Sequence, residues 1–125
     1  MAGSELDVLA RAVRMALEET HAEYAQMPFF VRPMVRRGFV KRTGYDLAAW
    51  GRLLDAAARG EVPPGLGAAL ALLAGHYDTA PARAKRGMGA RPEELREVER
   101  RSATRAAAVR ALAVVLREAT AVPGT

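Results

Sequence analysis

The apolar residues of this chain recur every three or four positions, and this spacing constrains the fold more than any other feature. In the first 25 residues it is followed by Leu6, Leu9, Val13, Leu17 and Tyr24. This period matches one face of an α-helix, whereas a half-buried strand needs alternation at every second residue. No segment shows such alternation or a run rich in valine and isoleucine. We therefore expect an all-α protein.

Two short core-facing helices are predicted in the middle of the chain. One follows Asp46, a suitable N-cap, and ends before Gly60. Its apolar face comprises Leu47, Trp50, Leu53, Leu54 and Ala57. The other follows Pro63 and Pro64. Its apolar face comprises Leu66, Leu70, Leu73 and Tyr77.

The last predicted helix is long. It begins at Pro92, and its apolar face extends to Leu116, although Ser102 and Arg105 fall on that face where apolar residues are expected. A helix of this length needs a neighbour, and the first helix is the natural antiparallel one. We expect a bundle of about five helices, in which the long C-terminal helix packs against the first.

The length fits a single domain over residues 1–125. Half of the residues are apolar but only 6% are aromatic, so we expect a thin core between closely spaced helices, which a second copy of the chain would help to complete in a homo-oligomer. At about 78–91, Pro81, Gly87 and Gly89 lie among small and basic residues. This composition predicts a mobile basic loop.

Positive charge is concentrated in two segments, although the formal net charge is only +5. The first cluster comprises Arg32, Arg36, Arg37, Lys41 and Arg42. The second comprises Arg83, Lys85, Arg86 and Arg91. Arginine favours phosphate and carboxylate partners.

The first cluster follows two adjacent phenylalanines, Phe29 and Phe30, near the start of a helix that Pro28 and Gly44 predict between them. Pro33 either kinks that helix or marks its true start, in which case the phenylalanines lie in the preceding turn. The rings either fill the core beside solvated arginines or form an apolar face with a cationic edge. The second arrangement is typical of a partner-binding surface.

No catalytic constellation is evident, and we expect a protein that is not an enzyme and needs no cofactor. The chain has no cysteine, two histidines and no phosphate-binding glycine loop. Glu18 and His21 have the Glu-x-x-His spacing of di-iron bundle proteins, but a second copy of the motif is missing, so they are only weak metal candidates. His76 lies near a predicted helix end, where the helix dipole favours a charged histidine.

We also expect a cytoplasmic protein without a secretion signal or a membrane span. Charged residues interrupt the N-terminal apolar positions. The longest run without Asp, Glu, Lys or Arg, from Val62 to Tyr77, contains two prolines and is shorter than the roughly 20 apolar residues of a membrane helix.

One segment resembles a known family. Pro28-Phe29-Phe30-Val31-Arg32, followed by Met34-Val35-Arg36-Arg37-Gly38, is similar to the signature of the small helical domain at the C-terminus of the light-independent protochlorophyllide reductase B subunit. The resemblance covers residues 28–57 and departs from the family at Pro33. It implies an accessory or docking module of a nitrogenase-like or tetrapyrrole-related system, and it assigns no catalytic residue.

Two functions follow as hypotheses. The first is a non-enzymatic docking module that binds a protein partner through Phe29, Phe30 and the first basic cluster. The alternative is a helical protein that binds nucleic acid through both basic clusters, although no helix-turn-helix spacing is evident.

Overall fold

The computed structural model describes residues 2–88 and 91–120, and within these ranges every regular element is an α-helix. The six helices are α1 (Ala2–Ala25), α2 (Arg32–Thr43), α3 (Leu47–Ala58), α4 (Leu66–Asp78), α5 (Ala80–Met88) and α6 (Pro92–Thr120). The all-α prediction is confirmed, but the predicted number of helices was one too low.

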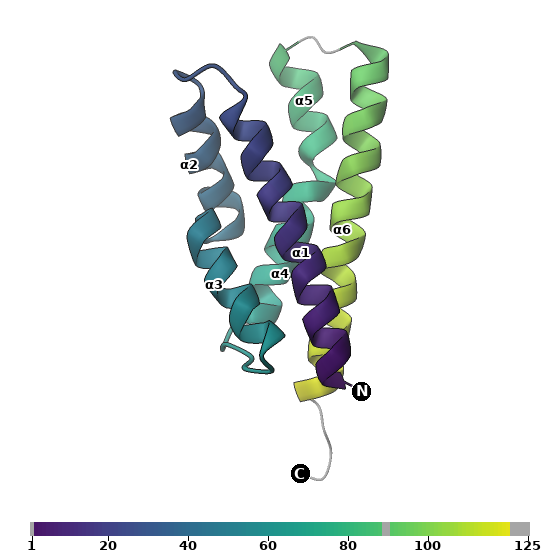
Figure 1. The fold of residues 1–125 in the computed structure, drawn as a ribbon. Coiled ribbons are helices and arrows are strands. Elements are labelled where there is room, and N and C mark those ends of the chain that lie inside the picture. The colour runs from purple at the N-terminus through teal and green to yellow at the C-terminus, as the bar shows by residue number, and fades with distance from the viewer. Residues whose placement is uncertain (1, 89–90, 121–125) are drawn as a thin grey trace.

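The helices form a bundle in which the chain runs alternately up and down. It ascends through α1, descends through α2 and α3, ascends through α4 and α5, and descends through α6 (Figure 1). Within each pair the two short helices stack end to end, because only residues 44–46 separate α2 from α3 and only Thr79 separates α4 from α5. The six helices therefore reproduce the up-down-up-down order of a simple bundle.

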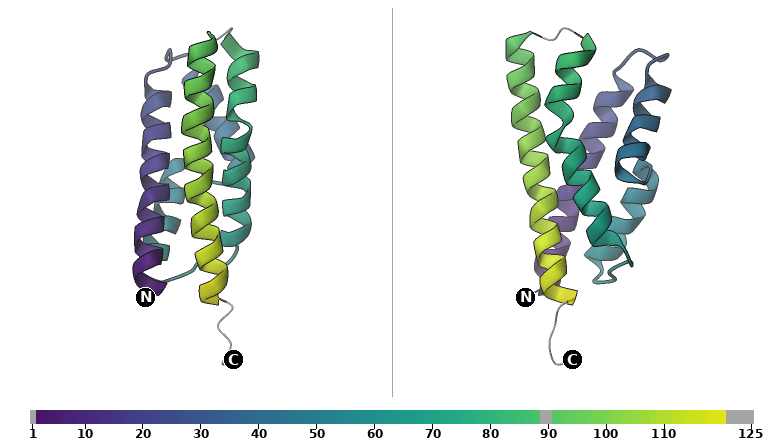
Figure 2. Two further views of the ribbon diagram at one scale, coloured as in Figure 1. Left: turned by 90° about the vertical axis from the view of Figure 1, so that its right-hand side faces the viewer. Right: turned by 180° about the vertical axis from the view of Figure 1, so that it is seen from behind.

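The long C-terminal helix packs against the first helix, as predicted, and the two run antiparallel (Figure 1). Figure 2 shows α6 between α1 on one side and the α4–α5 pair on the other. The predicted pairing is therefore correct but incomplete, because α6 also packs along α4 and α5.

The core combines the predicted apolar faces. Val13, Trp50, Leu70, Leu73 and Leu112 are among its most completely buried residues. The predicted positions Leu9, Leu47 and Leu53 are only partly buried but pack against this core. Alanines at several contact positions permit the close approach of helices that the low aromatic content suggested.

The prediction of a loop at about 78–91 was wrong, because residues 80–88 form α5. Pro81 is the second residue of this helix, where a proline costs no intrahelical hydrogen bond. Gly87 lies in its last turn, and Gly89 falls outside the described residues. Pro81 and Gly87 thus lie near the two ends of a short helix that packs along α6.

Pro33 marks the start of α2 and does not kink it. The helix begins at Arg32, so Pro33 lies in its first turn, and Phe29 and Phe30 lie in the preceding connection. Gly44 ends the helix with a left-handed backbone (φ 89°), and its N–H donates to the carbonyl oxygen of Val40.

In the described part of the chain, no helix combines the length and apolar character that crossing a membrane requires.

Candidate functional site

The aromatic turn, which we define as Pro28–Val31, connects α1 to α2. The Val31 N–H donates to the Pro28 carbonyl oxygen over 2.9 Å, which closes the turn. The Arg32 guanidinium donates to the Met27 carbonyl oxygen over 2.8 Å and fixes the adjacent backbone. Local hydrogen bonds therefore hold the turn without help from the core.

Both phenylalanines point away from the core. Phe29 is 78% exposed and Phe30 72% exposed, and their rings contact each other edge to face with centroids 5.9 Å apart. Met34, in the first turn of α2, is 62% exposed. Of the two arrangements that the sequence left open, the structure has the exposed one.

The basic residues of the first cluster divide into two groups. Arg36, Arg37 and Lys41 are exposed on α2, and none of the three forms an ion pair within residues 2–88 and 91–120. Arg32 is half-buried beside the turn, and Arg42 points inward to His76. We call the exposed group, Phe29, Phe30, Met34, Arg36 and Arg37, the aromatic-basic surface.

The second basic cluster also divides. Lys85 and Arg86 are exposed on α5, and Arg91 pairs with Glu94 over 3.6 Å. Arg83 is half-buried and contacts His76. The aromatic turn and α5 lie at the same end of the bundle, opposite the N-terminal end of α1 (Figure 1). The fold therefore brings two basic segments that are distant in sequence to one end of the molecule.

Arg42 and Arg83 meet at the His76 side chain. Arg42 Nε lies 3.1 Å from His76 Nδ1, and an Arg83 terminal nitrogen lies 3.2 Å from the same atom. A guanidinium can only donate, so Nδ1 must accept and the proton of the neutral ring must be on Nε2. Arg83 also donates to the His76 carbonyl oxygen over 2.7 Å.

The His76 ring is neutral. Burial, with the Arg83 and Arg42 charges in the same direction, lowers its pKa to about 3. Our interpretation of His76 as a charged residue favoured by a helix dipole was therefore wrong, because burial and two adjacent cations exclude the imidazolium.

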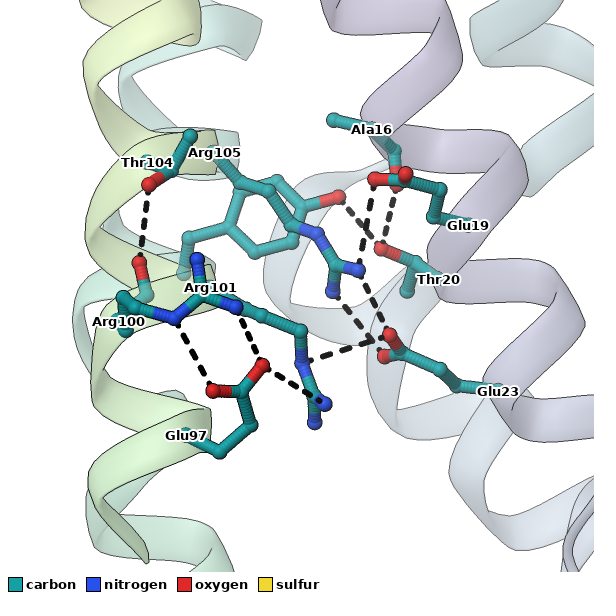
Figure 3. Close-up of polar contacts among 10 residues, drawn as sticks. Ala16, Glu19, Thr20, Glu23, Glu97, Arg100, Arg101, Thr104 and Arg105 are labelled. Carbon is teal, nitrogen blue, oxygen red and sulfur yellow. Dashed lines mark hydrogen bonds and ion pairs between the residues drawn. The ribbon is translucent and has the colours of Figure 1, made fainter. Parts of the chain in front are cut away.

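A separate polar network links α1 to α6 (Figure 3). Arg105, almost completely buried, donates to both carboxylate oxygens of Glu23 over 3.1 and 2.6 Å and lies 3.6 Å from Glu19. Arg101 adds ion pairs of 3.7 Å to Glu23 and Glu97. The hydrogen bond from Arg105 to Glu23 raises the Arg105 pKa further. Arg105, paired with carboxylates of α1, thus lies on the otherwise apolar face of α6.

Tyr77 belongs to the same layer. Its hydroxyl lies 2.8 Å from the Thr20 hydroxyl, which also contacts the Ala16 carbonyl oxygen at 2.8 Å. Burial raises the Tyr77 pKa to about 12, so the phenol stays protonated. This network was not predicted from the sequence, although Arg105 and Ser102 on an otherwise apolar face were a signal for it.

Glu18 and His21 line a groove of about 500 Å³ between α1 and α3, together with residues that include Arg14, Arg52 and Asp55. Glu18 pairs with Arg14 over 3.4 Å. Among the described residues, no three His, Cys, Asp or Glu side chains form a group able to hold a metal ion. The structure therefore adds no support to the weak metal candidates.

Comparison of the chain with protein-family models, curated proteins and solved structures gives no match. The resemblance of residues 28–57 to the reductase B-subunit domain therefore stays a prediction.

Proposed function

We propose that this chain is a non-enzymatic docking module that binds a protein partner through the aromatic-basic surface. The observation that best supports this function is the exposed pair Phe29 and Phe30 on a hydrogen-bonded turn, beside the exposed arginines Arg36 and Arg37.

The exposure of two adjacent aromatic rings has an energetic cost. Burying a phenylalanine side chain stabilises a protein by about 1.5–3 kcal/mol, and this chain leaves two such rings in water. The other large exposed apolar side chains are aliphatic or isolated, for example Val8, Met15 and Leu72. A partner that covers both rings would recover the burial energy that folding leaves unused.

The turn also limits the entropic cost of binding. Its closing hydrogen bond and the contact from Arg32 to Met27 fix the backbone, and the two rings restrict each other. Association then orders few additional groups, which favours affinity. Aromatic and arginine side chains are also the commonest hot spots of protein interfaces.

The surface determines the chemistry of the partner. Arg36 and Arg37 lack a carboxylate partner among the described side chains, so the complementary protein surface carries aspartate or glutamate around an apolar pocket. The resemblance of residues 28–57 adds a second prediction, that the partner belongs to a nitrogenase-like or tetrapyrrole-related assembly.

The experiment compares partner binding by purified variants. The partner is captured from the native organism with the wild-type chain, and its affinity is then measured with both proteins purified. We expect Arg36→Glu plus Arg37→Glu to weaken binding at least about tenfold, and Phe29→Ala plus Phe30→Ala to weaken it by about thirtyfold or more.

Matched controls lie elsewhere on the bundle. Arg52→Glu plus Arg59→Glu makes the same charge change on α3 and at its end, and Val8→Ala plus Met15→Ala removes exposed apolar side chains from α1. Both controls should bind normally. Equal binding by the folded Arg36→Glu plus Arg37→Glu variant and the wild type would defeat the proposal.

Nucleic acid is the alternative ligand that the two basic clusters suggest. Phosphate contacts make affinity fall steeply with salt, so duplex DNA binding that is absent at low salt eliminates this alternative. Salt-sensitive DNA binding that Arg36→Glu plus Arg37→Glu abolishes would replace the protein partner with nucleic acid.

A further inference from the structure

Two cations from separate helices converge on one neutral acceptor. Arg42 of α2 and Arg83 of α5 both approach His76 Nδ1, at 3.1 and 3.2 Å. A neutral imidazole nitrogen offers a single lone pair, so the two guanidiniums share one acceptor. His76 therefore orients both cations without neutralising either.

No aspartate or glutamate side chain compensates the positive charge of Arg42 and Arg83. All 14 aspartate and glutamate side chains lie in the part of the chain that the structure describes, and none forms an ion pair with Arg42 or Arg83. Arg110, by contrast, pairs with Asp78, which is only five positions before Arg83. Among the aspartate and glutamate side chains, the two converging arginines thus have no ion-pair partner.

Arg105 provides an internal comparison. Arg105 contacts Glu23 and Glu19, and its pKa is raised. Burial, together with the Arg42 charge, lowers the pKa of Arg83 to about 10. The pKa shifts of the two arginines therefore have opposite directions, and only Arg105 has carboxylates beside it.

Hydrogen-bond donors remain open at this site. The two terminal nitrogens of Arg42 and the Nε of Arg83 donate to no acceptor among the described residues. The Arg42 terminal nitrogens lie over Gly38, where a Cβ would come within 3.1 Å of one of them. The absence of a side chain at Gly38 therefore leaves room for the guanidinium group.

We propose that Arg42 and Arg83 bind a dianionic phosphate group, either inorganic phosphate or a phosphate monoester. The two open terminal nitrogens of Arg42 can donate parallel hydrogen bonds to two phosphate oxygens, and the open Nε of Arg83 supplies a further donor, so the pair provides both positive charge and donors for this anion. Exposed Arg86, three residues beyond Arg83, adds positive charge close to Arg83. This binding site is independent of the proposed docking function.

The test is a titration of the full chain with inorganic phosphate at constant ionic strength, followed by NMR of the arginine side-chain N–H groups and by calorimetry. We expect saturable binding at millimolar phosphate or below, with the largest shifts at Arg42 and Arg83. Arg42→Gln and Arg83→Gln should each lower the affinity at least about tenfold. The control Arg36→Gln plus Arg37→Gln removes more charge from the surface and should bind within about twofold of the wild type.

Two further ligands identify the anion. Phenyl phosphate, a dianionic monoester, should bind as well as inorganic phosphate, whereas dimethyl phosphate, a monoanionic diester, should bind at least about tenfold more weakly. No saturation in the wild-type chain, or equal losses in the Arg36→Gln plus Arg37→Gln control, would overturn the proposal. Should Arg42→Gln fail to fold, the NMR shifts of the wild-type chain still test the proposal. So does the phosphate affinity of Arg83→Lys, which keeps the positive charge but loses the planar guanidinium.

Discussion

At the residue scale, the buried polar side chains occupy two contrasting environments. Arg105 is surrounded by carboxylates, whereas Arg42 and Arg83 surround a neutral histidine. An ionised side chain that leaves water needs an opposite charge or several hydrogen bonds. The first environment meets this need with opposite charges, whereas Arg83 meets it with hydrogen bonds to Thr79 and His76 and has no carboxylate partner among the aspartate and glutamate side chains.

His76 should make stability depend on pH. Its pKa is about 3 in the folded chain against an ordinary 6.5, so the unfolded chain takes up a proton that the folded chain refuses between these values. The contribution of His76 to stability is therefore nearly constant well above pH 6.5 and decreases as the pH falls through this value, by up to about 1.4 kcal/mol per pH unit. Urea unfolding between about pH 5 and 6.5, above the range of most carboxylates, measures this slope.

The matched variants are His76→Gln and His21→Gln. The first should flatten the slope, because glutamine does not titrate, and the second replaces an exposed histidine as the control. A slope that persists in His76→Gln would show that other groups cause the pH dependence.

Arg105 should contribute more to stability than an exposed arginine of the same helix. Arg105→Ala removes two charge-assisted hydrogen bonds and leaves Glu23 without its hydrogen-bond donor. Because Arg105 is almost completely buried, we expect the free energy of unfolding to fall by about 1–3 kcal/mol. Arg100→Ala breaks an ion pair to Glu97 in solvent and should have a much smaller effect. Chemical denaturation of both variants checks this, and similar losses would argue against a structural role for the Arg105 network.

The exposed phenylalanines should contribute little to folding. Phe29→Ala and Phe30→Ala should each change the free energy of unfolding by less than about 0.5 kcal/mol, since both rings lie in water. Phe39→Ala, which empties a buried position, should cost about 3–5 kcal/mol. If thermal or urea unfolding shows a comparable loss for all three variants, the aromatic turn packs against the protein and cannot serve as a free surface.

At the element scale, the two ends of α2 determine what this helix presents. Pro33 in the first turn makes the helix begin after the phenylalanines, and Gly44 ends it before Trp50 enters the core. The Trp50 indole donates to the Thr43 hydroxyl over 3.1 Å, which joins α2 to α3 across the short connection. The aromatic turn is thus fixed at one end of a helix that is anchored at the other.

Two glycine-to-alanine variants contrast the left-handed end of α2 with the interior of another helix. Gly44→Ala should lower the free energy of unfolding by about 1 kcal/mol, because φ of 89° is unfavourable for a residue with a Cβ. Gly75→Ala, inside α4 with no atom within 4 Å of the added Cβ, should raise it by about 0.5–1 kcal/mol. Opposite signs are expected in urea denaturation, and a stabilising Gly44→Ala would contradict the left-handed helix end.

Apolar residues that recur every three or four positions predicted α1, α3, α4 and α6, whereas α2 was expected from the helix-boundary residues Pro28 and Gly44. α5 escaped prediction because its nine residues contain a proline, a glycine and no large apolar stripe, so its stability comes from packing on α6. Local sequence also did not decide the role of Pro33, because its position alone allowed either a kink or a helix start.

At the scale of the whole molecule, the site depends on contacts that no local pattern encodes. Arg42 and Arg83 are 41 positions apart, and the stacking of α5 on α4 places them beside the same histidine. The sequence identified both basic clusters and the phenylalanine pair. It did not indicate which arginines point outward, because that depends on how α2 is rotated against α1 and α4.

The bundle has one end with both the aromatic turn and the basic helix α5, and the central claim is that a protein partner binds there (Figure 1). The most direct measurement replaces Phe30 with a photo-cross-linking phenylalanine analogue in the native cell. A control chain carries the same analogue at Met15, which is also exposed, on α1. We predict one discrete cross-linked protein at position 30 that disappears with Arg36→Glu plus Arg37→Glu and is absent at position 15. The same cross-links at both positions, or a cross-link at position 30 only to a second copy of this chain, would contradict the claim.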